Sequence, residues 1–431
     1  MPRLWLLLLI AAVTINALVF ARLNPDRIVP GTDSAQYDTL AQQLLAGHGF
    51  TLDSEPPYTP TLVREPGYPV LVAMLYRLQG IEAVVVLQSL MLGLAAGVTA
   101  LIGIRLFGQL EGFIGGALFG LNTESAHYAH WLLTEIPFTF LLVGVLALAL
   151  LAQSRRRAAD FAACGVALGA AALVRVIAVT LVLPLCPGSI ASNARQHRLR
   201  DAFLLIASFV VVVAPWVVRN FATFGQPTIS SRFGVNLIRR APRAAEPPSA
   251  YSSWIIASIW IATNPLSDLV YPIGRFQWGP DYEDNLIWDF HVNDMVRYNS
   301  RYEPVCQPRP DPDACYAEIG LAFVRAYPLG YVVQSAFALV TLLFAPLPGP
   351  QALEHNGLVW LGLVTMVALA MRRRLCAPHW LVLGALLTYL AASIAVDTQV
   401  RYLLPVVPIF AIFAAVPVAA LVRRLRASGS A

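Results

Sequence analysis

The sequence contains no lysine, and all 30 of its basic residues are arginine. Without lysine, the chain has no side-chain amine that could form a Schiff base or act as a general base. Any permanent side-chain cation that contacts a phosphate must therefore be an arginine, whose guanidinium can bind two phosphate oxygens at once.

Charge of either sign is scarce as well. Only 13% of the 431 residues are charged and 57% are hydrophobic, whereas a soluble domain carries about 25% charged residues. Many apolar runs approach the length that crosses a bilayer, about 20 residues. Lipid admits only segments that satisfy their own backbone hydrogen bonds, so a soluble barrel or sandwich is excluded. The sequence predicts an all-α polytopic membrane protein with about ten transmembrane helices.

The arginines indicate how the chain is oriented in the bilayer. The net charge is +5, but the arginines stand at the ends of apolar runs, so we interpret them as topological markers and expect no nucleic-acid partner. The clusters at 155–157, 372–374 and 423–426 mark the inner face. The first apolar run, 4–20, is either a signal-peptide core or a first span, and its length favours an anchor. We expect both termini on the inner side.

Three parts of the chain follow from this topology. Residues 1–220 form an N-terminal transmembrane module with a first outer loop at 23–66. Residues 221–328 form an outer region with interfacial helices, favoured by four tryptophans, Trp254, Trp260, Trp278 and Trp288. Residues 329–431 form C-terminal transmembrane helices, in which 329–344 is an interfacial or re-entrant piece.

One arginine interrupts an apolar run. Arg175 lies inside the block 161–184, and an arginine in mid-run costs about 2.5–3.5 kcal/mol on insertion scales. We therefore expect an anionic partner for it. The block is predicted to be two short helices that turn near Arg175, and broken helices of this kind are where membrane proteins build sites.

The first outer loop contains a predicted helix over 33–46. Its apolar residues, from Tyr37 to Leu45, recur at helical spacing, and Gly47 ends it. Asp33 stands at its start. A cap from Asp33 or Thr32, worth about 1 kcal/mol, is the structural alternative to a catalytic role for that acid.

Polar side chains gather in the predicted outer loops, and Arg175 would approach them from within the membrane. They are Asp33, Asp38, Arg64, Glu65, Tyr68, Glu124, His127, His130, Glu135, Arg219, Arg232, Arg401 and Tyr402. Acids and arginines on one face suit the transfer of a group attached to a phosphate. Arginines neutralise the departing phosphate, and a carboxylate deprotonates the acceptor. The structural alternatives are an interfacial position for Arg64 and a helix-dipole role for Glu135.

Two further patterns concern metals and disulfides. Glu124 and His127 share a helix face, which leaves a divalent metal ion as the weaker alternative to a polar cluster near the membrane surface; no other cofactor is indicated. Cys306 and Cys315 lie nine residues apart in a proline-rich polar loop. If that loop faces an oxidising compartment, a disulfide is expected. The other three cysteines, Cys164, Cys186 and Cys376, sit in or beside apolar runs and are expected to be inert.

Six short motifs in order carry a resemblance to a known family. They are D-S-A-Q-Y-D-T-L-A-Q-Q-L-L-A-G-H-G-F at 33–50, R-E-P-G-Y-P at 64–69, L-T-E-I-P-F-T-F-L-L at 133–142, A-L-V-R-V at 172–176, P-W-V-V-R-N-F at 215–221 with G-Q-P at 225–227, and R-Y-L-L-P-V-V-P at 401–408. In this order and spacing, the chain resembles the bacterial GT-C glycosyltransferases related to protein O-mannosyltransferases and to the lipid A aminoarabinose transferase.

The resemblance implies a function and roles for residues. The family transfers a sugar from a polyprenyl-phosphate carrier at the outer, periplasmic face of the bacterial inner membrane. Asp33 would be the catalytic carboxylate and Glu135 the second acidic position. Arg64 would contact the donor phosphate, with Arg175, Arg219 and Arg401 as secondary contacts. We expect the remaining substrate contacts from Tyr37, Asp38, Tyr68, Glu124, His127 and Tyr402.

Two departures from the family concern the acceptor. Ser34 follows Asp33 where protein O-mannosyltransferases commonly have an acid, and no large soluble C-terminal domain follows the spans. Both favour a lipid-linked or cell-envelope glycan as acceptor over a protein. The alternative function is a flippase or transporter for a polyprenyl-linked glycan, which the broken helix at Arg175 would suit. The concentration of acids at one face favours the enzyme.

Overall fold

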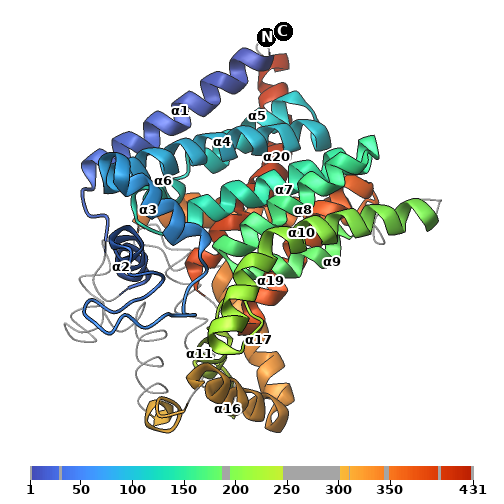
Figure 1. Ribbon diagram of the computed structural model, residues 1–431. Coiled ribbons are helices and arrows are strands. Elements are labelled where there is room, and N and C mark those ends of the chain that lie inside the picture. The colour runs from blue at the N-terminus through green and yellow to red at the C-terminus, as the bar shows by residue number, and fades with distance from the viewer. Residues whose placement is uncertain are drawn as a thin grey trace, which may run out of the picture. The chain divides into compact units, whose positions relative to one another are not determined.

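The computed structural model describes residues 2–28, 32–186, 195–245, 301–309, 311–343, 349–396 and 399–428. These residues form helices and no strand (Figure 1), so the predicted all-α fold is confirmed. They divide into two compact units. The first contains 1–230, 358–389 and 404–431, and the second contains 231–357 and 390–403. The division predicted from the sequence, at 220 and 328, stays a prediction, and the four tryptophans of its middle part lie outside the described residues.

The helices of the N-terminal half belong to the first unit. They are α1 (Pro2–Leu23), α2 (Asp33–Ala46), α3 (Gly67–Gln79), α4 (Ile81–Phe107), α5 (Gln109–Gly120), α6 (Thr123–His130), α7 (Glu135–Arg155), α8 (Ala158–Val174), η1 (Val176–Leu181), α9 (Val182–Leu185) and α10 (Arg195–Phe224). The later elements are α11 (Phe233–Ile238), η2 (Ala241–Ala245), α16 (Pro312–Ala326), α17 (Pro328–Leu343), α18 (Gly349–Met371), α19 (Ala377–Val396), η3 (Val400–Val406) and α20 (Val407–Ser428).

Within the described residues, seven helices are long and apolar enough to cross a membrane. The number is eight if the bent pair α16 and α17, which meet at 104°, counts as one span. The chain is a multi-pass membrane protein, and the predicted number of about ten was approximate. The difference arises where apolar runs are short or broken: α5 has only 12 residues, and the block 161–184 divides at Arg175.

The outer surfaces of the long helices are apolar. Leu7 on α1 is 63% exposed and Val211 on α10 is 72% exposed. Side chains of this kind are stable at a surface when they face lipid, because lipid tails are themselves apolar. These two helices therefore present faces suited to the bilayer.

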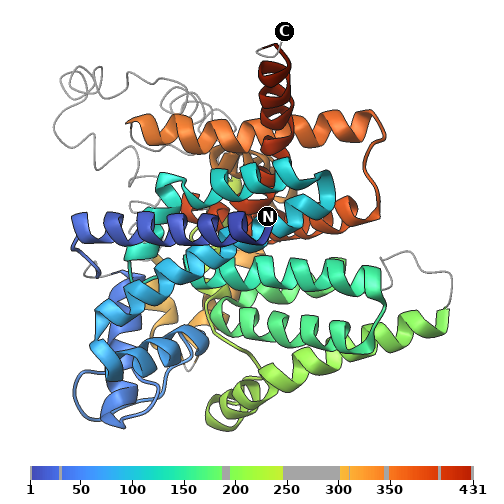
Figure 2. The same cartoon turned by 90° about the horizontal axis from the view of Figure 1, so that it is seen from above.

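Helix α4 lies at the centre of the first unit. It packs against α1, α5 and α7, and α7 in turn packs against α8 (Figures 1 and 2). Glycines bring the backbones close: a Cβ on Gly103 of α4 would lie 2.8 Å from the Cα of Gly112 on α5. Small residues allow this approach in membrane helices, where van der Waals packing drives association.

Helices α8 and α10 lie side by side and run in the same direction. A Cβ on Gly165 would meet the Leu205 carbonyl oxygen at 2.2 Å, and one on Gly169 would meet Val212 Cβ at 2.8 Å. The residue numbers rise together along both helices, so their C-terminal ends point the same way. Helix α10 continues through Arg219 and Asn220 to Phe224.

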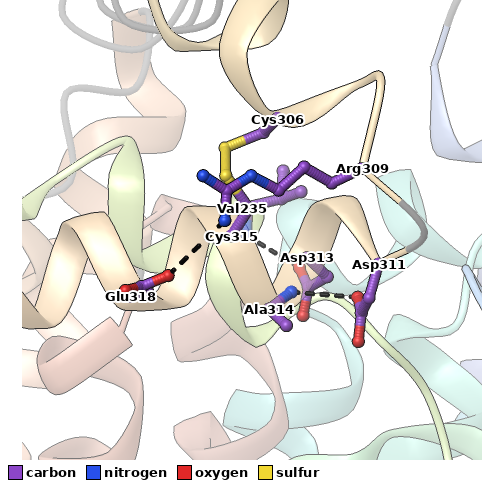
Figure 3. The surroundings of a disulfide bond; sticks show 8 residues. All are labelled: Val235, Cys306, Arg309, Asp311, Asp313, Ala314, Cys315 and Glu318. Atoms are coloured by element: carbon purple, nitrogen blue, oxygen red, sulfur yellow. Dashed lines mark hydrogen bonds and ion pairs between the residues drawn. A yellow bond between two sulfur atoms is a disulfide. The ribbon is translucent and has the colours of Figure 1, made fainter.

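The second unit contains a disulfide between Cys306 and Cys315, whose Cα atoms lie 5.5 Å apart (Figure 3). Both cysteines are buried against Ile238 and Tyr316. Asp313, beside Cys315, accepts the backbone N–H groups of Gly234 and Val235 at 3.1 and 2.9 Å. The carboxylate thus caps the start of α11, and the disulfide holds the preceding segment onto α16.

Candidate active site

Helix α2 positions the first acid of the site. It begins at Asp33 after Thr32 and ends at Gly47, whose φ of +81° favours glycine. Both ends agree with the sequence prediction. Asp33 is the first helical residue, and Tyr37, one turn later, is buried. The two side chains therefore lie on the same side of the helix.

Arg64 is the cation nearest this acid. Its guanidinium forms an ion pair with Asp33 Oδ1 and donates to Gln36 Oε1 at 2.8 Å. It also lies over the Tyr37 ring, 5.0 Å from the centroid. Arg64 is only 5% exposed, so it is held inside the protein rather than extended along the interface.

Two buried tyrosines, Tyr37 and Tyr68, pack against each other, and Tyr37 lies next to Arg64. The rings of Tyr37 and Tyr68 meet edge to face with centroids 5.0 Å apart. Tyr68 donates its hydroxyl to Gln88 Oε1 at 2.6 Å. Burial raises the pKa of both phenols, so both hold their protons throughout the neutral range.

The second acid of the site pairs with the arginine at the helix break. Arg175 has extended backbone angles, φ −147° and ψ +118°, between α8 and η1. Its guanidinium donates to Glu135 Oε1 at 2.6 Å and to Thr134 Oγ1 at 2.8 Å. Glu135 is fully buried. The sequence predicted both the break and an anionic partner for Arg175, and in the structure that partner is Glu135.

Glu65 accepts a backbone hydrogen bond at the helix break near Arg175. Its Oε1 accepts the backbone N–H of Val176 at 3.2 Å and the Ser230 hydroxyl at 3.0 Å. A break in a helix leaves backbone donors without their usual partners, and Glu65 satisfies one of them. The segment between α2 and α3, the break at Arg175 and the segment after α10 therefore meet at this carboxylate.

Each ion pair contributes to the electrostatic environment of at least one of the two tyrosines. Arg64, Asp33, Glu65 and Arg175 all contribute to the electrostatic environment of Tyr37, and Glu135 contributes to that of Tyr68. The four charges of the two pairs sum to zero. The arrangement offers two carboxylates and two guanidinium groups around a tyrosine pair, which is a set that can hold a phosphate and accept a proton.

Two other candidate residues contact different partners. Asp38 accepts from Tyr76 at 2.6 Å and from Gln42 at 2.8 Å. Arg219 donates to the Thr61 carbonyl at 3.3 Å and lies 4.7 Å from the Trp216 ring. These contacts connect α2 to α3, and α10 to the segment between α2 and α3.

Helix α6 places its histidines among aromatic rings. The His127 ring lies 5.2 Å from that of His130 and 4.7 Å from that of Trp131, and Phe20 packs on both histidines. Glu124 is buried at the helix start. In the part of the chain that the structure describes, no three His, Cys, Asp or Glu side chains come together to hold a metal ion.

Arg401 and Tyr402 belong to the second unit. Both lie in η3, where Arg401 donates to Gln399 Oε1 at 2.6 Å and its guanidinium lies 5.6 Å from the Tyr402 ring. Arg232 also belongs to the second unit and directly precedes α11.

Sequence reasoning gave no role to three residues of the site, Gln36, Gln88 and Thr134, and it named Glu65 only as one member of the polar set. Gln36 could have been found, because it lies one turn after Asp33 on the predicted helix. A glutamine such as Gln88 within an apolar run is also a signal, since a buried amide requires partners. Nothing in the sequence singled out Thr134.

The helical fold is similar to that of a solved membrane oligosaccharyltransferase. The chain matches the archaeal oligosaccharyltransferase AglB from Archaeoglobus fulgidus, solved with an inhibitory peptide and a dolichol-phosphate, with a TM-score of 0.56 at 14% identity over 99% of this chain and 51% of that one. The apo form of that enzyme gives a TM-score of 0.55 at 13% identity, covering 99% and 52%. ArnT from Cupriavidus metallidurans, bound to undecaprenyl phosphate, gives 0.41 at 16% identity, covering 95% and 77%.

The chain therefore spans about half the length of the AglB structures that it matches. No family model matches the sequence, and no curated protein matches it either. The resemblance inferred from the six motifs is confirmed at the level of the fold.

Proposed function

We propose that the chain is a membrane glycosyltransferase that moves a sugar from a polyprenyl-phosphate donor to a hydroxyl of a lipid-linked or cell-envelope glycan. The observation that carries the proposal is the pairing of Asp33 with Arg64 in a GT-C fold. A carboxylate beside a buried guanidinium supplies the two functions that such a transfer requires. The AglB structure contains dolichol-phosphate, a lipid phosphate of the class proposed here.

The reaction follows from these two groups. The acceptor hydroxyl attacks the anomeric carbon of the sugar, and the Asp33 carboxylate takes the hydroxyl proton. The bond between the anomeric carbon and the phosphate oxygen breaks, and its electron pair leaves with the lipid phosphate. Arg64 neutralises the charge that develops there. Attack opposite to the leaving group inverts the configuration of the sugar.

Glu135 and Arg175 take the second position in the proposal. Arg175 would provide a second guanidinium for the phosphate, and Glu135 would hold that guanidinium in place through their hydrogen bond at 2.6 Å. Arg219, which belongs to the same unit, would assist as a secondary contact for the lipid phosphate.

We place the reaction at the periplasmic face of a bacterial inner membrane, with both termini in the cytoplasm. The arginine clusters at 155–157, 372–374 and 423–426 support this orientation. In Figure 1 the start of α1 and the end of α20 lie at the same end of the first unit, which agrees with it.

The test is an Asp33→Asn variant in membranes supplied with a polyprenyl-phosphate sugar. We expect transfer to fall by on the order of 100-fold or more, the usual contribution of a positioned base. Asp26→Asn is the matched control, because Asp26 is an exposed acid of the same outer loop. Full transfer by Asp33→Asn would refute the assignment. Movement of the lipid across the membrane without any transfer by the wild type would instead favour the flippase.

A further inference from the structure

Gln88 is a buried amide in a predominantly apolar helix. It lies on α4 near the end that begins at Ile81, and it is only 1% exposed. An amide removed from water is unfavourable unless hydrogen bonds replace the lost water. The partners of Gln88 therefore identify what the residue is there to hold.

Three hydrogen bonds surround this amide. Gln88 Oε1 accepts from the Tyr68 hydroxyl at 2.6 Å. Gln88 Nε2 donates to the carbonyl oxygen of Ala129 at 2.9 Å and to that of Trp131 at 2.8 Å. Two carbonyls can only accept, so the NH2 group must face them and the oxygen must face the hydroxyl. The orientation of the amide is fixed by its partners.

The side-chain oxygen of Gln88 is connected to the Asp33–Arg64 ion pair through two tyrosines. Tyr68 packs edge to face on Tyr37, and Tyr37 lies under the Arg64 guanidinium. Arg64 in turn pairs with Asp33. Gln88 thus fixes the hydroxyl end of the inner tyrosine, against which the outer tyrosine and its arginine are stacked.

The side-chain nitrogen of Gln88 is connected to the Glu135–Arg175 ion pair through the backbone before α7. The two carbonyls belong to the end of α6 and to the short connection before α7. The Trp131 carbonyl also accepts the backbone N–H of Leu133 at 2.8 Å, so it anchors a tight turn. Thr134 and Glu135, the two partners of Arg175, follow that turn directly.

We propose that Gln88 is a positioning residue for the transfer, because its single amide sets the distance between the Asp33–Arg64 pair and the Glu135–Arg175 pair. This inference rests on the proposed function. Gln88 is connected to the first pair through the Tyr68–Tyr37 ring contact and to the second through the turn at Trp131, and it has no direct hydrogen bond to either pair. Its effect on the reaction is therefore expected through geometry alone, as a change in where the two guanidinium groups converge on the lipid phosphate.

The experiment compares Gln88→Glu, Gln88→Met and Ser89→Ala in the purified full chain, reconstituted in lipid bilayers. Gln88→Met removes all three hydrogen bonds at nearly constant volume. Gln88→Glu replaces the NH2 by an oxygen that can donate only when the carboxyl is protonated. Ser89→Ala is the matched control, because Ser89 is the fully buried neighbour on α4 whose hydroxyl has no hydrogen-bond partner in the described residues.

Two quantities are measured for each variant: the rate of transfer from a polyprenyl-phosphate sugar, and the affinity for undecaprenyl phosphate. We expect Gln88→Met to lower kcat/KM by roughly 100-fold, the size of effect that a displacement of about 1 Å produces, and to weaken lipid binding. Ser89→Ala should match the wild type. Gln88→Glu should resemble Gln88→Met at pH 8 and regain transfer, relative to the wild type, as the pH falls towards 5.

The recovery at low pH separates positioning from a general loss of structure. A protonated carboxyl can donate to one carbonyl and accept from Tyr68, which restores two of the three hydrogen bonds. Loss of transfer by Gln88→Glu that does not change with pH would overturn the proposal, as would wild-type kinetics in both Gln88 variants. If the wild type transfers no sugar, the proposed function fails, and undiminished undecaprenyl-phosphate affinity in the Gln88 variants would then refute the role of Gln88 separately.

Discussion

Arg175 and Glu135 lie 40 residues apart in the sequence, and their side chains are joined by a hydrogen bond of 2.6 Å between Nη2 and Oε1. The acid is fully buried and the arginine side chain is 14% exposed. The two charges stabilise each other, because burying either one without its partner would cost free energy. The pair also joins the end of α8 to the start of α7.

The first prediction concerns this pair. Replacing one partner leaves a buried charge uncompensated, so Arg175→Met should lower the free energy of unfolding by about 3–5 kcal/mol. The double variant Arg175→Met with Glu135→Leu should recover much of that loss. Thermal unfolding in detergent measures both. Losses that simply add in the double variant would show that the two residues do not interact.

The second prediction concerns the donor site. Arg64→Lys keeps the positive charge but loses the planar fork that contacts Asp33, Gln36 and Tyr37 together. We expect the affinity for undecaprenyl phosphate and the transfer rate both to fall at least tenfold. Arg77→Lys, at an exposed arginine of α3, is the control and should behave as the wild type. Equal activity of the two variants would remove Arg64 from the phosphate site.

The third prediction concerns the contact between α3 and α8. A Cβ on Gly67 would lie 2.7 Å from the backbone carbonyl oxygen of Leu173, and backbone cannot move aside as a side chain can. Gly67→Ala should therefore destabilise the protein by about 1–3 kcal/mol and displace the break at Arg175. Gly144→Ala is the comparison, because a Cβ there meets nothing within 4 Å. A normal unfolding temperature for Gly67→Ala would contradict this close approach.

The fourth prediction concerns pH. Burial lowers the pKa of His130 to about 4, and the charges of the neighbouring His127 and Arg27 act in the same direction. Since the pKa in the unfolded chain is about 6.5, protonation favours the unfolded chain as the pH falls. The neutral ring thus contributes stability above about pH 6.5, and that contribution is lost towards pH 4.

His130→Phe should remove this pH dependence. The measurement is the unfolding temperature in detergent between pH 7.5 and 5, where the wild type should lose more than the variant. His48→Phe, at an exposed histidine, should retain the wild-type dependence. Parallel curves for the wild type and His130→Phe would show that His130 does not titrate differently in the folded state.

Local signals in the sequence predicted the elements that local chemistry determines. Gly47 ended the helix that begins at Asp33, and the cost of an intramembrane arginine predicted the break at Arg175 together with an anionic partner. The identity of that partner depends on a contact between residues 40 apart, which neither periodicity nor composition encodes. The same is true of Gln88, whose partners Ala129 and Trp131 offer only backbone atoms and so leave no mark on the side-chain pattern.

The charge balance of the site has a consequence for how a ligand reaches it. Each guanidinium of the Asp33–Arg64 and Glu135–Arg175 pairs is already neutralised by its own carboxylate, so the four groups project little net field beyond their immediate surroundings. We therefore expect that an anionic headgroup is not steered to these residues from a distance and reaches them by diffusion along the bilayer. The association rate should accordingly change little with ionic strength, unlike that of ligands drawn to an open basic patch.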